Sequence, residues 1–420
     1  MGASVAVGVE PAVPEQTLML EQAHEFALQN HPQLAAAQLR ALASLEVVRE
    51  TRSSFFPTAN AYVTAVDAGN ENTRILAGGL NNPSVFDRVA GGVSVSQIIT
   101  DFGQTSNLTA SAKSQAKAQG QGATATREEI LLNVDVNYFS LLEAQAVLHV
   151  AQQTLGTRQL LLDQVNALAA NKLKSELDVS FAQVALGEAQ LLQEKAEGDV
   201  EAGQASLSAA LGYHEQHRFT LVDPDFSSAL PSDISALIET ALRNRPEILR
   251  LRYEHDAAQS FAQAQKDQNY PTIAAVGTIG DAPSHDDHLP EHYAAAGINL
   301  NLPLFAGGLY TARQHEAELK ARAAEENLRD EEDSVIRDVR TAWLNCNTTL
   351  QRLRTTEQLL KHATEAFDLA QARYKIGSSS IVELSEAQLS QTSAEIAQAN
   401  AHYDELIQRS ILDYQVGALN

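Results

Sequence analysis

Hydrophobic residues recur at every seventh position along two long stretches of the chain. Neither stretch, 84–223 or 304–420, contains a proline, so each can form long uninterrupted helices. Six successive heptad positions are apolar or aromatic in both stretches, which is typical of coiled coils. These positions are Val134, Leu141, Leu148, Leu155, Leu162 and Ala169, and then Val339, Cys346, Leu353, Leu360, Phe367 and Tyr374.

The pattern predicts a helix from about Gly103 to Ala170. At about 1.5 Å per residue it would be roughly 100 Å long, which no compact globule accommodates. The companion heptad positions are mostly small, such as Ala144, Ala151 and Ala363, so neighbouring helices can approach closely.

Shorter segments alternate apolar and polar residues with a period of two. Val93 and Val95 alternate with serines, and Ile298, Leu300 and Leu302 alternate with asparagines. Such alternation indicates strands with one apolar face. We expect four strands, at about 58–67, 89–99, 272–281 and 293–302, joined in pairs by polar loops from Asp67 to Arg88 and from Asp281 to His292.

The two sets of helices and strands belong to an internal repeat. Ala27–Leu34 matches Ala241–Ile248 at an offset of 214, and the offset becomes 205 after the first strand pair, where Tyr138 matches Trp343. We divide the chain into an N-terminal extension (1–19), a first repeat (20–211), a linker (212–233) and a second repeat (234–417). Each repeat reads as helix, helix, hairpin, long helix, helix.

Four strands of about ten residues suit a bilayer, but backbone inside lipid must be hydrogen-bonded in a closed sheet. One chain cannot close a barrel from four strands. Two chains would give eight strands and a filled interior, whereas three would give twelve and room for a pore. A cyclic homotrimer with a twelve-stranded transmembrane β-barrel is therefore expected, within a mainly α fold that has long coiled-coil helices.

Composition narrows the functional classes. With 30 basic and 53 acidic residues, the formal charge is 30 − 53 = −23, which argues against nucleic-acid binding. No apolar run is long enough for a transmembrane helix. Met1 to Pro14 lacks the features of a signal peptide, so we expect either that one has been removed or that the chain is cytosolic. The single cysteine, Cys346, excludes an intrachain disulfide and a cysteine-based zinc site.

Several duplicated motifs resemble those of the TolC-like outer-membrane efflux factor family over nearly the whole chain. They are the Ala-Leu-x-Asn-x-Pro openings at Ala27 and Ala241, the Phe/Tyr-Pro-Thr strand entries at Phe56 and Tyr270, the strand exits Ile98–Gly103 and Pro303–Gly308, and the tip Arg373–Gly377 leading to Ala387-Gln388.

The resemblance implies a trimeric passive channel in the cell outer membrane, whose long coiled-coil helices form an α-barrel that extends into the periplasm. It would form the exit duct of a tripartite efflux pump or a type I secretion system, together with a periplasmic adaptor protein and an inner-membrane pump, in contact with outer-membrane lipid. No catalytic residue, cofactor or metal is expected. The rival interpretation is a periplasmic or cytosolic soluble coiled-coil scaffold without a channel.

Two predicted turns at the ends of the long helices carry the candidate site residues. Ser175 followed by Asp178, and Ser380 followed by Glu383, both fit a capping box, in which a serine caps the helix and an acid returns the bond. Glu386 lies three residues after Glu383, on the same helix face, and capping does not require it.

The family resemblance gives these residues a further role. Glu383 and Glu386 match acids that form rings at the periplasmic constriction, and Tyr374 and Asp178 match a latch that closes the tip. The sequence departs from the family pattern at Ser379, where other members carry a latch arginine.

Two other groups have simpler interpretations. His285, Asp286, Asp287, His288 and His292 are spaced like metal ligands, but they lie in a predicted exposed loop where polar residues are expected. Gly120-Gln121-Gly122 is similar to part of a dinucleotide-binding loop, but no strand precedes it.

Overall fold

The computed structural model describes residues 16–67, 88–224, 230–231, 233–284 and 290–419. Most of the predicted N-terminal extension, most of the long loop of the first repeat, and His285 to His288 lie outside these residues. Among the predicted metal-ligand loop residues, only His292 is described; its Nδ1 pairs with the Asp281 carboxylate at 2.5 Å.

The chain forms two compact units, and each takes parts of both repeats. The helical unit consists of 1–38, 122–248 and 331–420, and the sheet unit consists of 39–121 and 249–330. Helices α4 (Gln104–Ala170) and α8 (Leu309–Lys375), each of 67 residues, contribute to both units. These units group residues that lie close together in space, and each mixes the two repeats. They therefore do not test the repeat boundaries, which stay a prediction.

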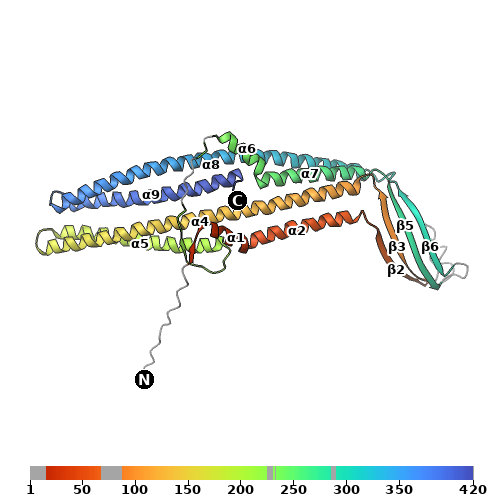
Figure 1. The fold of residues 1–420 in the computed structure, drawn as a ribbon, viewed down its shortest axis with the longest axis horizontal. Helices are drawn as coiled ribbons and strands as arrows, with labels where there is room; N and C mark the ends of the chain where they lie inside the picture. Colours follow the sequence, from red (N-terminus) through yellow and green to blue (C-terminus); the bar gives the residue numbers. More distant parts are fainter. Residues whose placement is uncertain (1–15, 68–87, 225–229, 232, 285–289, 420) are drawn as a thin grey trace, which may run out of the picture. The chain divides into compact units, whose positions relative to one another are not determined.

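The predicted order of helices and strands is confirmed in both repeats (Figure 1). The first repeat contains α1 (Leu20–Asn30), α2 (Pro32–Ser53), β2 (Thr58–Val66), β3 (Arg88–Thr100), α4 and α5 (Glu176–Ala210). The second contains α6 (Ile234–Asn244), α7 (Pro246–Asp267), β5 (Thr272–Ser284), β6 (His292–Asn301), α8 and α9 (Ile381–Val416). None of the described helices combines the length and the hydropathy needed to cross a membrane.

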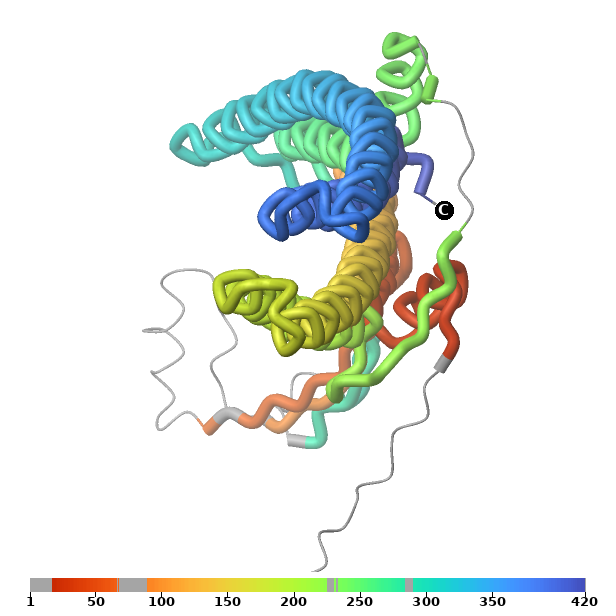
Figure 2. Tube along the Cα trace, turned by 90° about the vertical axis from the view of Figure 1, so that its left-hand side faces the viewer, coloured from red at the N-terminus to blue at the C-terminus, as the bar shows by residue number. Residues whose placement is uncertain are grey.

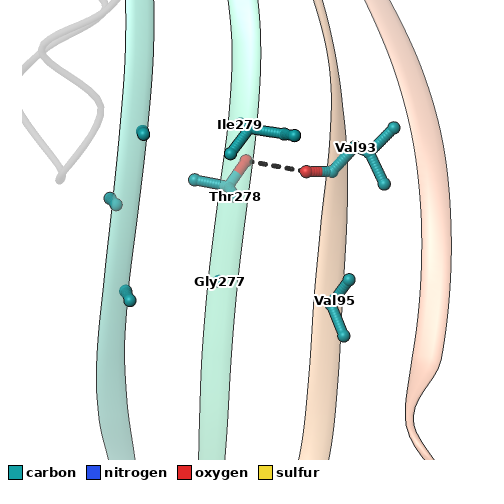
Figure 3. A pocket seen from close by; sticks show the side chains of 8 residues that line it. Val93, Val95, Gly277, Thr278 and Ile279 are labelled. Carbon is teal, nitrogen blue, oxygen red and sulfur yellow. Dashed lines mark hydrogen bonds between the residues drawn. The ribbon is translucent and has the colours of Figure 1, made fainter.

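The sheet unit is built on one antiparallel sheet with strand order β2-β3-β5-β6. Val93 on β3 pairs with Ala61 on β2 and with Ile279 on β5, so apolar residues of neighbouring strands share a face, as the alternation predicted. This apolar face has a shallow hollow where Gly277, Ala294 and Ala296 lie among larger side chains (Figure 3). The outer edges of β2 and β6 have no partner strand within the described chain.

The opposite face of the sheet carries a hydrogen-bonded tyrosine pair. The Tyr62 hydroxyl lies 2.9 Å from the Tyr293 hydroxyl and 2.9 Å from Thr278 Oγ1, and Tyr293 donates to the backbone oxygen of Gly91 at 3.2 Å. A Cβ at Gly92 would collide with the Tyr293 hydroxyl, so this glycine is needed for the close approach. The pair ties residues of all four strands together from the polar face.

In the helical unit a small second sheet covers α4. Two short strands that the sequence pattern did not predict, β1 (Gln16–Leu18) and β4 (Phe219–Leu221), pair in parallel. Tyr138 of α4 is fully buried beneath them, and its hydroxyl lies 2.9 Å from the backbone oxygen of Leu18 and 2.7 Å from that of Val222, so its single proton is shared between the two acceptors. These contacts hold the ends of β1 and β4 against α4.

The predicted heptad register is only partly right. Val134 and Leu141 are fully buried, as expected, but Leu148, Leu155 and Leu162 are only half-buried. Farther along α4 the buried side chains are Ala151, which is a predicted companion position, and Thr154, Arg158, Leu161 and Val165. A straight α-helix drifts by about 20° per heptad relative to a strict seven-residue repeat. The buried face of α4 therefore rotates away from these leucines and comes to contain other positions of the heptad.

Replacement of leucines along α4 should reflect this shift. We expect Leu141→Ala to cost about 3 kcal/mol of stability, because the side chain is fully buried, and Leu155→Ala to cost about half as much. Arg352→Ala should cost less than about 1 kcal/mol, because Arg352 is exposed and pairs with Asp404 only at the surface, 2.9 Å away. Equal losses in chemical denaturation would contradict the observed buried face.

A buried carboxyl group in the helical unit makes its stability sensitive to pH. Glu128 on α4 is 7% exposed, and burial together with the nearby charge of Glu247 raises its pKa from 4.5 to about 7, against the opposing effect of Arg127 and Arg245. Arg245 itself is buried and pairs with Glu247 at 3.2 Å. The carboxylate of Glu128 is therefore the less favoured form in the folded chain.

We expect Glu128→Gln to remove this pH dependence. The folded pKa is raised, so the stabilising contribution of the neutral form is complete below the unfolded pKa near 4.5 and is lost as pH rises through about 7. The variant should match wild type near pH 4.5 and exceed it at pH 8, by on the order of 2 kcal/mol in free energy of unfolding. A difference independent of pH in denaturation curves would show that Glu128 is not the titrating group.

Candidate gate at the ends of the helical hairpins

The turns of the α4–α5 and α8–α9 hairpins lie next to each other within the helical unit (Figure 2). The first turn passes through Lys172 at φ 57°, and the second passes through Gly377 at φ 74°. A left-handed backbone conformation suits glycine and is uncommon for other residues. The glycine of the second turn is therefore a recognisable turn signal in the sequence, whereas the lysine of the first turn is not. All predicted site residues lie within or close to these two turns.

Asp178 forms the capping box that the sequence predicted. The Ser175 side chain accepts from the backbone N–H of Asp178 at 3.2 Å, and the Asp178 carboxylate accepts from the Ser175 backbone N–H at 2.9 Å and from its hydroxyl at 2.8 Å. These bonds, first of all the one from the backbone, hold the pKa of Asp178 below its usual range.

Glu383 forms only half of the expected box. Ser380 accepts from the backbone N–H of Glu383 at 3.2 Å, but the carboxylate pairs with Arg373 at 2.9 Å. Arg373 lies in the last turn of α8, across the hairpin from Glu383, and offers a charged donor in place of a neutral N–H. The ion pair thus replaces the return bond of the box and ties the two helices of this hairpin together.

Glu386 is exposed on α9, one turn after Glu383. Its carboxylate forms no hydrogen bond or ion pair with any part of the chain that the structure describes. Capping and local pairing therefore give no reason for an acid at this position.

Tyr374 lies buried between the two hairpins. It belongs to an apolar cluster with residues of α4, α5 and α9, and the ammonium group of Lys174 lies 4.3 Å from the centre of its ring. Burial, and secondly the charge of Asp178, raise its pKa, so the phenol stays neutral. Asp178 and Tyr374 are therefore close enough to interact electrostatically, but the buried Tyr374 hydroxyl has no hydrogen-bond partner among the described residues, so the two form no hydrogen-bonded latch within this chain.

Two basic residues at the site had no role assigned from the sequence. They are Lys174, which contacts Tyr374, and Arg373, which pairs with Glu383. Lys174 directly precedes the capping serine Ser175 and lies two residues from Glu176, which is a weak signal of local ion pairing, whereas Arg373 is ten residues from Glu383 and carries no such signal. The buried hydroxyl of Ser379, at the position of the family's latch arginine, has no partner among the described residues.

The outer membrane efflux protein family model matches residues 24–213 and 237–417. The chain belongs to this family. Two matched segments, one in each repeat, account for most of the sequence.

Curated relatives and solved structures agree with the family. The chain is 26% identical to the outer membrane protein TolC of Vibrio cholerae over 409 residues, covering 96% of this chain and 91% of TolC. It is 22% identical to the cation efflux system protein CusC of Escherichia coli, covering 87% and 79%. A crystal structure of CusC has the same fold, with a TM-score of 0.84, 20% identity and coverage of 99% and 100%. The open-state MtrE channel of Neisseria gonorrhoeae has a TM-score of 0.79, 20% identity and coverage of 96% and 89%.

This efflux channel protein is therefore located in the outer membrane, and the predicted fold class, a mainly α chain with two repeats and four barrel strands, is confirmed. The alternative of a soluble scaffold is wrong, because the relatives along the whole chain are outer-membrane efflux proteins.

Polar contacts join the two hairpins of the efflux channel farther from the turns. Thr154 of α4 and Thr392 of α9 lie 3.2 Å apart, and the buried Arg158 donates to the backbone oxygen of Ser385 at 3.3 Å. One guanidinium nitrogen of Arg158 has no partner among the described residues, and burial lowers the pKa of Arg158. Among those residues no group of three or more His, Cys, Asp or Glu side chains is placed to hold a metal ion.

Proposed function

We propose that three copies of this chain form a passive exit duct gated at its periplasmic end, and that it works with a periplasmic adaptor and an inner-membrane pump. The observation that carries the proposal is the four-stranded sheet with unpaired outer edges on β2 and β6. In lipid these edges need partners, and the third copy completes a twelve-stranded barrel with an open interior. Transport in this proposal involves no catalytic residue, cofactor or metal.

The internal repeat supplies a second argument for assembly. Helices α4 and α9 pack together within the chain, and their repeat mates are α8 and α5. In the helical unit α5 and α8 are the outer helices of the layer (Figure 1), and both expose leucines: Leu177 and Leu191 on α5, and Leu359 and Leu369 on α8. We infer that α8 of one chain packs on α5 of the next as α4 packs on α9, which makes the contacts around the ring nearly equivalent.

Exposed aromatic residues support membrane insertion of the sheet. Every junction between a helix and a strand of the sheet unit carries an exposed aromatic side chain: Phe56, Phe102, Tyr270 and Phe305. Aromatic girdles mark the interfaces between membrane and water in transmembrane barrels. We infer that these four residues lie at the periplasmic boundary of the outer membrane.

Assembly can be tested with cysteines in the edge strands. Purified protein in mild detergent should have a mass of three chains of 45.3 kDa, about 136 kDa, by light scattering. Ala61→Cys on β2 combined with Ala294→Cys, Ala296→Cys or Ile298→Cys on β6 should give a disulfide-linked trimer in at least one register. The central-strand control, Val93→Cys with the same partners, should not. A monomer or dimer in detergent would overturn the trimer.

The gate proposal assigns Glu383 and Glu386 to the constriction. Two acids from each of three chains would place six carboxylates around the aperture. This ring of negative charge would favour the passage of cations and bind multivalent cations. Replacing both with Gln preserves size and removes this charge. We expect weaker cation selectivity and weaker block by a trivalent cation in planar-bilayer recordings. Unchanged selectivity and block would leave these acids with only local roles.

Asp178→Asn provides the contrasting variant. It weakens the capping box and removes the charge beside Tyr374, so the α4–α5 turn should loosen. We expect conductance to rise while ion selectivity changes little. A loss of selectivity with unchanged conductance would place Asp178, rather than the two glutamates, in the charged ring.

A further inference from the structure

A small cleft lies between α4, α8 and α9, close to the hairpin turns. Its deepest side chains, Leu161, Tyr374, Leu384 and Gln388, are all buried, and its rim includes the exposed Leu160 and Lys375. Its volume is about 110 Å³. The lining comes from both helical hairpins, so the cleft exists only while the two hairpins stay in the arrangement described.

Gln388 gives the cleft a polar group at its floor. The residue is 4% exposed, yet its carboxamide forms no hydrogen bond within the part of the chain that the structure describes. Its repeat mate, Gln183, is exposed, so water can bind its amide group. The amide of Gln388 lines the cleft, so its donor and its acceptor can pair with a molecule that enters, and the buried Tyr374 hydroxyl, which also belongs to a lining residue, has no partner among the described residues.

The size and lining of the cleft define the class of ligand. An apolar cavity of about 150 Å³ accommodates benzene, so this cleft suits one six-membered ring or less. Leu161, Phe367 and Leu384 offer apolar surface to the ring, and Gln388 offers one hydrogen-bonding site. Apart from Lys375 at the rim, every lining side chain is uncharged, so a charged group deeper in the cleft would lack an ionic partner, which favours an uncharged ligand.

We propose that this cleft binds a small uncharged ring compound with one hydroxyl or carbonyl group, and that the bound compound holds the two hairpins together. A ligand that contacts both hairpins in one arrangement shifts the equilibrium towards that arrangement. Binding of the compound does not depend on the proposed gate, whereas the effect of the compound on conductance rests on that proposed function.

The test uses 4-fluorophenol and fluorine NMR on the purified full-length channel in detergent. Wild type should show saturable binding, with a Kd of about a millimolar for so small a ligand. Leu160→Trp covers the cleft from its rim and should abolish saturation. The matched control is Leu42→Trp, the same change at an exposed leucine of α2 that does not line the cleft, and it should bind as wild type does.

Gln388→Leu tests the polar anchor. It keeps side-chain size and removes the amide, so affinity for 4-fluorophenol should fall about tenfold. The Gln183→Leu control at the exposed repeat mate should leave affinity unchanged. If Gln388→Leu fails to assemble, the two tryptophan variants still decide the location of the site.

Planar-bilayer recordings test the consequence. 4-Fluorophenol should lower the conductance of wild type and of Leu42→Trp, and should leave that of Leu160→Trp unchanged. Linear partitioning into detergent without saturation, or saturable binding that survives Leu160→Trp, would overturn the site. Saturable binding without any effect on conductance would overturn the link to the hairpins. In each of these cases normal wild-type conductance would leave the channel function intact.

Discussion

The unpaired edges of the sheet are the constraint on which the rest of the structure depends. Each residue at the outer edge of β2 or β6 carries backbone donors and acceptors, and lipid offers nothing to satisfy them. A chain with only four strands must therefore meet other copies, and the long helices must meet them too. This requirement explains why a single chain exposes large apolar side chains such as Val184 and Leu369, which a monomeric globule would bury.

In the proposed trimer, the repeat allows one packing arrangement to be used twice, within a chain and between chains. Differences between the repeat mates show where the two uses diverge. The buried Thr154 and Arg158 of α4 correspond to Leu359 and Ala363 of α8, so the contact within the chain is polar while its counterpart is apolar. Buried polar contacts depend strongly on geometry, whereas apolar contacts tolerate small shifts. The two kinds of contact therefore differ in how they can respond to movement at the tip.

The tip residues illustrate how local bonds compete for the same acids. The Asp178 carboxylate caps its own helix and Glu383 pairs with Arg373 across its hairpin, while Glu386 has no hydrogen bond or ion pair among the described residues. Only the last is fully available to a surface shared by several copies. Tyr374 is held mainly by apolar packing and by Lys174, so closure of the two hairpins in one chain does not rely on a hydrogen bond to the tyrosine.

The sequence by itself determined the repeat, the four amphipathic strands, the helix that ends at Ala170 and the capping serines, because each depends on residues close together in the chain. Only the tertiary structure decided which heptad positions are buried along α4, since helix drift and the neighbouring helices select Val165 over Leu162. It also decided that Glu383 meets Arg373 and that Gln388, unlike Gln183, is buried. Periodicity fixes the face of a helix only approximately, and the partner that a charged or amide group finds depends on which distant segments fold beside it.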